Sequence, residues 1–153
     1  MSWLSDREIA TKIRRNADSK TLNAFLGIYP IDRLPQFVPH LPIIIIVNTH
    51  THNLQGEHWK TVFIDENKNG ELFDSLALPV SSKLIRWLNT FTRKWKKNHL
   101  SYQDPLSATC GAYAVYFTLL RLDVSSLKSV TETLSPYPHV NERRVLTFYK
   151  QLK

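Results

Sequence analysis

The hydrophobic positions along the chain follow two different periods, and each predicts its own kind of element. Apolar residues recur at helical spacing in five segments. The helices predicted from them span about 6–16, 82–97, 107–122, 126–134 and 141–152. The run 43–49 holds four consecutive isoleucines and predicts a buried strand, because β-branched side chains favour extended chain. Two more predicted strands, 60–65 and 71–76, are joined by a polar turn at 66–70. The pattern predicts an α+β fold, with helices packed on a small, mostly antiparallel sheet.

The first helix has a defined start, and the length of the chain suits one domain. Ser5 with Glu8 three positions later is a capping-box pattern for a helix over 6–16. With 153 residues, 42% of them hydrophobic, one core can form, so we expect a single domain over 1–153. The longest apolar run, 41–47, is too short to cross a bilayer, and no charged-then-apolar leader is visible. We therefore expect a soluble protein made in the cytosol, with no membrane contact.

The charge of the chain favours a polyanionic partner. Lysine and arginine number 20 against 13 acidic residues, for a net charge of +7. The segment 83–99 has no acidic residue. Its basic residues are Lys83, Arg86, Arg93, Lys94, Lys96 and Lys97. Both a solvated helix face and a nucleic-acid contact explain such a run. Its aromatic residues do not decide the matter, because Phe91 and Trp95 continue an apolar helical stripe.

The candidate chemistry centres on Cys110, which is the only cysteine in the chain. A single cysteine forbids an intrachain disulfide and fits a reducing compartment. Cys110 starts a predicted apolar helix, whose N-terminal amides and dipole are expected to lower the pKa of the thiol. His58, Asp74 and Gln103 precede it in the chain and supply the other parts of a Cys/His/acid site. The alternative is a buried, unreactive cysteine.

Each candidate residue has an expected role. The Cys110 thiolate would attack a peptide carbonyl, and His58 would hold the proton and pass it to the leaving amine. Asp74 would orient the imidazole, and the Gln103 side chain with the Cys110 amide would stabilise the oxyanion. Glu71 is a rival acid, but it should point to the opposite face of its strand. Symmetric pairing of the two strands would place Asp74 near Val62 instead of His58, so the site requires a bulge, a twist or another register.

Two motifs that are typical of metal sites have better explanations. Residues 65–70 match the first half of a calcium-binding loop, but position 76 is leucine where a glutamate is required, so we interpret them as a hairpin turn. His50, His52 and His58 could suggest zinc, yet no cysteine ligand is near and a loop separates them. We expect no metal, and nothing in the sequence requires a cofactor.

Several strings, in order along nearly the whole chain, resemble the adenovirus-type cysteine endopeptidase (adenain) family, within the class of SUMO-deconjugating-like cysteine proteases. The strings are Phe25-Leu26-Gly27-x-Tyr29, Pro35-x-Phe37-Val38, Val47-Asn48-Thr49, Gly56-x-His58-Trp59, Phe73-Asp74, Gln103-x-Pro105-x-Ser107-Ala108-x-Cys110-Gly111 and, more weakly, Asn141-Glu142-Arg143-Arg144. The resemblance implies an adenain-like (papain-like) cysteine protease fold. It also implies an endopeptidase that cleaves viral or virus-like structural precursor proteins at glycine-containing motifs.

The resemblance also implies activators and leaves alternatives open. Enzymes of the family use DNA as an activating surface and a peptide tethered through a second cysteine. This chain lacks that cysteine, so a peptide activator could bind only non-covalently. Asp74 stands where adenovirus enzymes usually have glutamate, which resembles the SUMO-deconjugating branch. The alternatives are therefore a SUMO-type deconjugating protease and a non-catalytic, basic nucleic-acid-binding module. We expect a monomer, in the host nucleus and virion if viral and otherwise nuclear or cytoplasmic.

Overall fold

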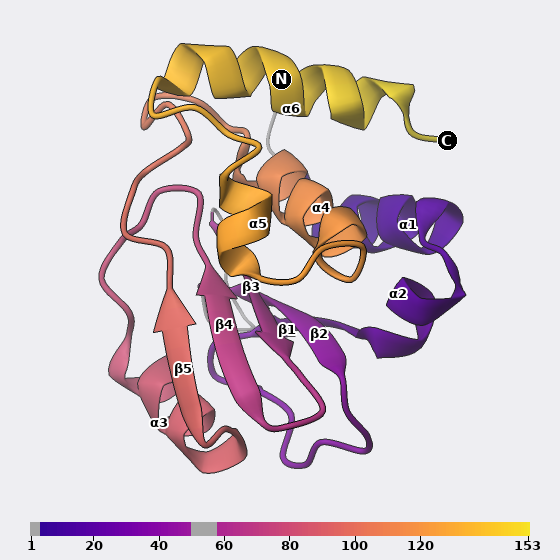
Figure 1. The fold of residues 1–153 in the computed structure, drawn as a ribbon, viewed down its shortest axis with the longest axis vertical. Coiled ribbons are helices and arrows are strands. Elements are labelled where there is room, and N and C mark those ends of the chain that lie inside the picture. The colour runs from indigo at the N-terminus through magenta and orange to yellow at the C-terminus, as the bar shows by residue number, and fades with distance from the viewer. Residues whose placement is uncertain (1–3, 50–57) are drawn as a thin grey trace.

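The computed structural model describes residues 4–49 and 58–153 and shows a five-stranded sheet between two layers of helices (Figure 1). The strands are β1 (Phe25–Pro30), β2 (Ile43–Asn48), β3 (Trp59–Ile64), β4 (Asn69–Phe73) and β5 (Lys94–Lys97). The helices are α1 (Asp6–Asn16), α2 (Ser19–Ala24), α3 (Ser82–Phe91), α4 (Cys110–Arg121), α5 (Leu127–Thr131) and α6 (Pro138–Gln151). The predicted α+β class is confirmed.

The strands lie in their chain order, β1-β2-β3-β4-β5, and their directions are mixed. The two central pairs, β2 with β3 and β3 with β4, are antiparallel, as the sequence predicted. The two outer pairs, β1 with β2 and β4 with β5, are parallel. The sequence analysis predicted neither outer strand, which is why it described the sheet as mostly antiparallel.

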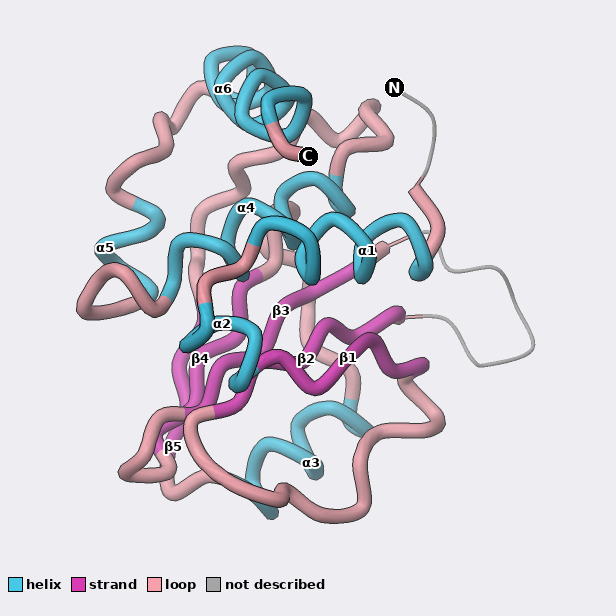
Figure 2. The backbone as a smooth tube through the Cα atoms, turned by 90° about the vertical axis from the view of Figure 1, so that its right-hand side faces the viewer, coloured by secondary structure: helices cyan, strands magenta, loops and turns pink. Residues whose placement is uncertain are grey.

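The isoleucine run divides its side chains between two cores. Ile44 and Ile46 pack into the larger core, with α1, α2, α4, α5 and α6, whereas Ile43 and Ile45 pack with α3 on the other face. Figure 2 shows α3 alone on its side of the sheet, with the other helices on the opposite side. A strand covered on both faces has no polar face, so the alternation typical of a half-exposed strand is absent from 43–48.

The first helix begins and ends where its pattern predicted. The Ser5 hydroxyl accepts a hydrogen bond from the Glu8 amide, and the Glu8 carboxylate accepts one from the Ser5 amide, which completes the capping box. Ile9 and Ile13 are buried against the larger core. The other predicted helices extend over α4, α5 and α6, with ends that differ by three or fewer residues.

The predicted helix over 82–97 is wrong beyond Phe91, because the chain turns there and forms strand β5. The Thr92 amide and hydroxyl both donate to the Leu88 carbonyl and end α3. β5 then lies beside β4, with Gly70 opposite Trp95. A Cβ at position 70 would lie 2.7 Å from a methyl carbon of Thr92. The turn that follows α3 can pack against β4 because residue 70 is glycine. Long-range pairing thus overrides the helical pattern that runs as far as Trp95.

The turn between β3 and β4 is the predicted hairpin turn, and Asp65 holds it closed. One oxygen of the Asp65 carboxylate accepts hydrogen bonds from the amides of Asn67 and Asn69. These are local side-chain contacts of the kind that stabilise turns. Within 4–49 and 58–153, no helix is long and apolar enough to span a membrane. Within the same ranges, no group of three or more histidine, cysteine or acidic side chains is placed to hold a metal ion.

A buried ion pair joins the sheet to α4. Arg121 Nε lies 2.6 Å from Glu71 Oε1, and both side chains are less than 10% exposed. The guanidinium also lies 4.1 Å from the centre of the Phe63 ring, and Glu71 accepts the Leu127 amide. Glu71 therefore points away from Asp74, into the α4 face of the sheet, as the strand alternation predicted.

Arg121→Ala should lower the free energy of unfolding by about 3 to 5 kcal/mol, because it leaves the Glu71 carboxylate buried without its cation. Urea denaturation followed by circular dichroism measures the change. The control is Lys128→Ala, which removes an exposed partner of Glu132 and should cost less than about 1 kcal/mol. If both variants lost the same free energy of unfolding, the buried ion pair would stabilise the fold no more than the exposed one.

Candidate active site

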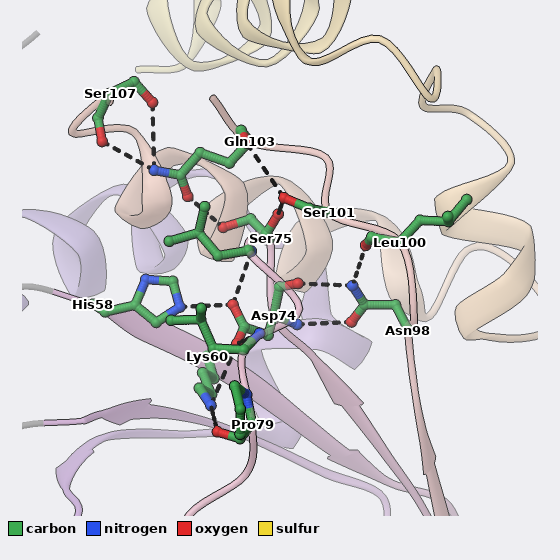
Figure 3. Close-up of polar contacts among 12 residues, drawn as sticks. His58, Lys60, Asp74, Ser75, Pro79, Asn98, Leu100, Ser101, Gln103 and Ser107 are labelled. Atoms are coloured by element: carbon green, nitrogen blue, oxygen red, sulfur yellow. Dashed lines mark hydrogen bonds and ion pairs between the residues drawn. The ribbon is translucent and has the colours of Figure 1, made fainter. Parts of the chain in front are cut away.

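His58 and Asp74 meet because strands β3 and β4 pair symmetrically about Asn67, one residue before the centre of the predicted 66–70 turn. The register places Val62 opposite Leu72, and its last assigned pair is Thr61 with Phe73. Asp74 follows that pair directly, so it reaches the end of the sheet at which β3 begins. His58 Nε2 lies 2.6 Å from Asp74 Oδ1 in this arrangement (Figure 3).

Four donors surround the Asp74 carboxylate. Oδ1 accepts from His58 and from the Leu76 amide, while Oδ2 accepts from the Leu78 amide and lies 3.3 Å from the Lys60 ammonium. Burial raises the pKa of Asp74. The hydrogen bond and charge of His58, the charge of Lys60 and the Leu76 amide outweigh burial, and the pKa is lowered below its ordinary value. Asp74 is therefore ionised at neutral pH.

The charge on Asp74 fixes the form of the histidine ring. A carboxylate only accepts, so His58 Nε2 carries the hydrogen of this bond. In the neutral imidazole, Nδ1 is then the basic nitrogen. His58 Nδ1 is buried and has no hydrogen-bond partner within the described residues. The ring thus presents an open proton acceptor on the side away from Asp74.

Asn98 holds the backbone at Asp74. Its side-chain oxygen accepts the Asp74 amide at 2.9 Å, and its Nδ2 donates to the carbonyls of Asp74 and Leu100 (Figure 3). Asn98 is 6% exposed, so these bonds are shielded from water. Asn98 was not predicted from the sequence, because its contacts with Asp74 span 24 positions.

Cys110 begins α4, three residues after the predicted start of this helix at 107, and its sulfur lies beside the residue that follows His58. The backbone amides of Trp59, Gly111 and Cys110 itself face this sulfur and lower the pKa of the thiol. The pKa expectation is wrong, because the side chain is only 1% exposed. Burial raises the pKa of the thiol to about 11 and outweighs the three amides, while the charge of Asp74 raises it further. The resting group is therefore a thiol.

The side chain of Thr109, the residue before α4, does not bond the first amides of the helix. These amides are therefore available to other partners. Thr109 makes no side-chain cap hydrogen bond. Its hydroxyl lies 2.9 Å and 3.0 Å from the Glu142 carboxylate oxygens and 2.7 Å from the Ser107 hydroxyl. Glu142 also accepts from Tyr113 and so ties α6 to α4. The amides at the start of α4 point toward the sulfur, where they can also donate to an oxyanion.

Gln103 is buried, and both ends of its amide are held. The Ser75 hydroxyl donates to Gln103 Oε1 at 2.6 Å, and Gln103 Nε2 donates to the Ser107 carbonyl at 3.1 Å (Figure 3). The Ser107 carbonyl only accepts, so it fixes which end of the amide carries the NH2 group. Of the two Nε2 hydrogens, the carbonyl takes one, and the Ser107 hydroxyl lies 3.4 Å from the same nitrogen. Asp74 and Ser75 thus orient His58 and Gln103 from consecutive positions.

The structure brings His58, Asp74, Gln103 and Cys110 to one end of the sheet, where β3 begins, β4 ends and α4 starts. Sequence analysis missed Lys60, Ser75, Asn98 and Glu142. Lys60 had a detectable signal, since it alternates with Val62 and Ile64 along an otherwise apolar strand face. His50 and His52 lie outside the described residues.

The six basic residues of the acid-free segment do not form one helix face. Lys83 and Arg86 lie on α3, Arg93 follows the end of that helix, and Lys94, Lys96 and Lys97 belong to β5. Five of them are exposed, and Lys97 is half-buried. Trp95 also lies on β5, where its indole donates to Asn89.

Comparison with solved structures shows a shared fold with a viral protease. One crystal structure of the ASFV pS273R protease superposes with a TM-score of 0.64 at 17% identity, over 94% of this chain and 66% of that one. A second, with selenomethionine, gives a TM-score of 0.54 at 20% identity over 71% of this chain. At these identities the likeness shows the fold alone. This chain spans 43% and 66% of the two protease structures.

A second protein shares the fold over its whole compared length. The central domain of the uncharacterized Lpg1148 protein from Legionella pneumophila gives a TM-score of 0.55 at 13% identity, with 98% of each chain covered. No protein-family model matches the sequence, and no curated protein matches it. The resemblance to the adenain family therefore stays a prediction.

Ser75→Ala should lower the free energy of unfolding by about 1 to 3 kcal/mol, since it leaves the buried Gln103 oxygen without a donor. Thermal or urea unfolding measures the loss. Ser101→Ala is the matched control, because the Ser101 hydroxyl makes only two long contacts of 3.4 Å. An equal loss in both variants would contradict a specific role for Ser75.

Proposed function

We propose that this chain is a cysteine protease that uses Cys110 as its nucleophile and His58, Asp74 and Gln103 as its supporting groups. The observation that carries the proposal is the His58 ring, tied to an ionised Asp74 through Nε2 with Nδ1 open and buried. The Cys110 sulfur lies against the amide of the residue after His58. A base, its orienting acid and a thiol in this relation are the parts of a nucleophilic site.

The first step is a proton transfer within the site. His58 Nδ1 takes the proton of the Cys110 thiol, and the thiolate attacks the carbonyl carbon of a peptide bond. The carbon–sulfur bond forms as the carbonyl π electrons move to oxygen. The imidazolium then gives its proton to the leaving amine as the carbon–nitrogen bond breaks. Water, deprotonated by His58, hydrolyses the thioester and returns the thiol.

The oxyanion needs donors that are already in place. The amides of Cys110 and Gly111 start α4, and Gln103 Nε2 would turn a hydrogen from its long, 3.4 Å contact with the Ser107 hydroxyl to the oxyanion. Ser75 and Glu142 support this group of donors, since Ser75 orients Gln103 and Glu142 engages the Thr109 hydroxyl.

A pocket lies beside His58, next to Lys60 and Leu78, which contact the Asp74 carboxylate. Its volume is about 170 Å³, and apolar side chains that include Ile31, Leu78 and Leu84 line it together with Lys60. Because the pocket adjoins His58, we propose that a substrate side chain close to the scissile bond lies in it. The pocket suits a small or apolar side chain.

Two substrate classes are consistent with this chemistry. The first is a viral or virus-like structural precursor protein, cut by an endopeptidase at glycine-containing motifs. The second is a conjugate of a ubiquitin-like modifier, cut by a deconjugating enzyme. The resemblance to adenain supports the first, and the aspartate at position 74 supports the second. A panel of glycine-motif peptides and modifier conjugates separates them, with Cys110→Ala as the inactive control.

His58→Gln should change how alkylation of Cys110 depends on pH. In the parent chain, burial raises the pKa of the Cys110 thiol to about 11, so direct ionisation is rare at pH 7, and His58→Gln removes the proposed proton acceptor. The rate with iodoacetamide should then rise about tenfold per pH unit between pH 6 and 9. The parent chain should show a flatter profile near neutral pH, because His58 takes the thiol proton as the sulfur attacks and hydroxide is not needed.

The slope, and not the absolute rate, is the readout, since burial slows both chains alike. Alkylation of each chain unfolded in urea gives the ordinary thiol profile as the control. Identical slopes for the folded parent and the folded His58→Gln chain would contradict the proposed proton transfer and the mechanism with it.

We also propose that the exposed basic residues bind nucleic acid and that activation by DNA or a non-covalent peptide regulates the same site. Lys83 and Arg86 lie three positions apart on α3, and Lys94 and Lys96 lie on the same face of β5. Such exposed cations suit phosphate contacts.

Replacing Lys94 and Lys96 by glutamine should weaken duplex DNA binding and reduce its salt slope by about 0.9 per lost phosphate contact. Binding measured by fluorescence anisotropy over a range of salt concentrations gives that slope. The control replaces Arg143 and Arg144, two exposed cations on α6 in the other helix layer. Equal effects of the two pairs would mean that only net charge matters.

A further inference from the structure

We infer that Lys60 is a positioning residue of the proposed site that acts through Asp74: it shares the charge of the Asp74 carboxylate with His58, so that His58 can release its proton. This inference rests on the proposed protease function. It assigns a role to a side chain that the Cys/His/acid mechanism itself does not use.

The position of Lys60 is unusual for a lysine. It lies on β3 opposite Val47, and alternation places it on the same strand face as Val62 and Ile64, which belong to the α3-side core. The residue is only 4% exposed. A buried ammonium is costly unless it is paired, and its contacts are Asp74 Oδ2 at 3.3 Å and the Pro79 carbonyl at 3.4 Å (Figure 3).

Lys60 is not needed to orient Asp74. The amides of Leu76 and Leu78 hold the two carboxylate oxygens from the chain that follows, and Asn98 fixes the Asp74 backbone. Removal of the ammonium would leave these contacts and the His58 hydrogen bond in place. The distinct contribution of Lys60 is therefore its positive charge.

That charge changes the balance within the site. The titratable or charged groups that face Asp74 are His58, which precedes β3, Lys60 on β3 and Cys110 at the start of α4. An unshared Asp74 carboxylate would stabilise the imidazolium strongly and hold its proton. With Lys60 on the second oxygen, Asp74 stabilises the imidazolium less, which favours proton delivery to a leaving amine.

The test is an NMR titration of the His58 ring in the full chain carrying Cys110→Ala, so that no protease activity is required. His58 is assigned by the signal that His58→Gln removes. Lys60→Met should raise the midpoint of this titration by about one pH unit, since it removes a cation from a poorly solvated site. Lys60→Arg should keep the midpoint of the parent.

Two further variants complete the experiment. Lys83→Met removes an exposed cation on α3 and should leave the His58 midpoint unchanged, because solvent screens it. Lys60→Gln gives the same reading as Lys60→Met if the methionine variant does not fold. An unchanged or lowered midpoint in the neutral Lys60 variants overturns the inference. That result would leave the protease proposal standing, which depends on cleavage and on the alkylation slope.

Discussion

The structure of the site depends on one hydrogen bond, between His58 Nε2 and Asp74 Oδ1 at 2.6 Å. This bond sets the tautomer of the ring and leaves Nδ1 as the open base. It exists because the β3–β4 register carries Asp74 past the last strand pair, to the end of the sheet where β3 begins. A register shift by one residue would turn the β4 side chains to the opposite faces and replace Asp74 by a neighbour.

The start of α4 shows how the fold keeps donors available. A threonine before a helix usually caps it with its hydroxyl. Here the Thr109 hydroxyl is engaged by Glu142 and Ser107 and makes no cap hydrogen bond, and the amides of Cys110 and Gly111 lie beside the sulfur. α6 contributes Glu142 from 33 positions along the chain. A helix that lies far from the nucleophile in sequence thereby keeps the proposed oxyanion donors free of the usual local partner.

The elements that the sequence predicted correctly are those that depend on residues close together in the chain. The Ser5–Glu8 box placed α1, the isoleucine run placed β2, and the turn at Asp65 placed the β3–β4 hairpin. Strand β5 escaped prediction because its helical periodicity conflicts with a pairing that depends on the small size of Gly70. The four candidate site residues were found from their types and spacing. The residues that hold them, Ser75 and Asn98 among them, act through contacts that no local pattern reveals.

Burial also reversed one expectation drawn from local structure. The start of a helix lowers the pKa of a thiol when water or a cation accompanies it. Cys110 is 1% exposed, and burial raises the pKa of its thiol by more than three backbone amides lower it. The proposed proton transfer to His58 would avoid the cost of an isolated thiolate, because the site would gain a positive and a negative charge together. With Asp74 paired to Lys60, the four groups sum to zero charge before and after the transfer. A buried site can therefore ionise its nucleophile without changing its net charge, so the buried lysine and the buried thiol are parts of the same electrostatic arrangement.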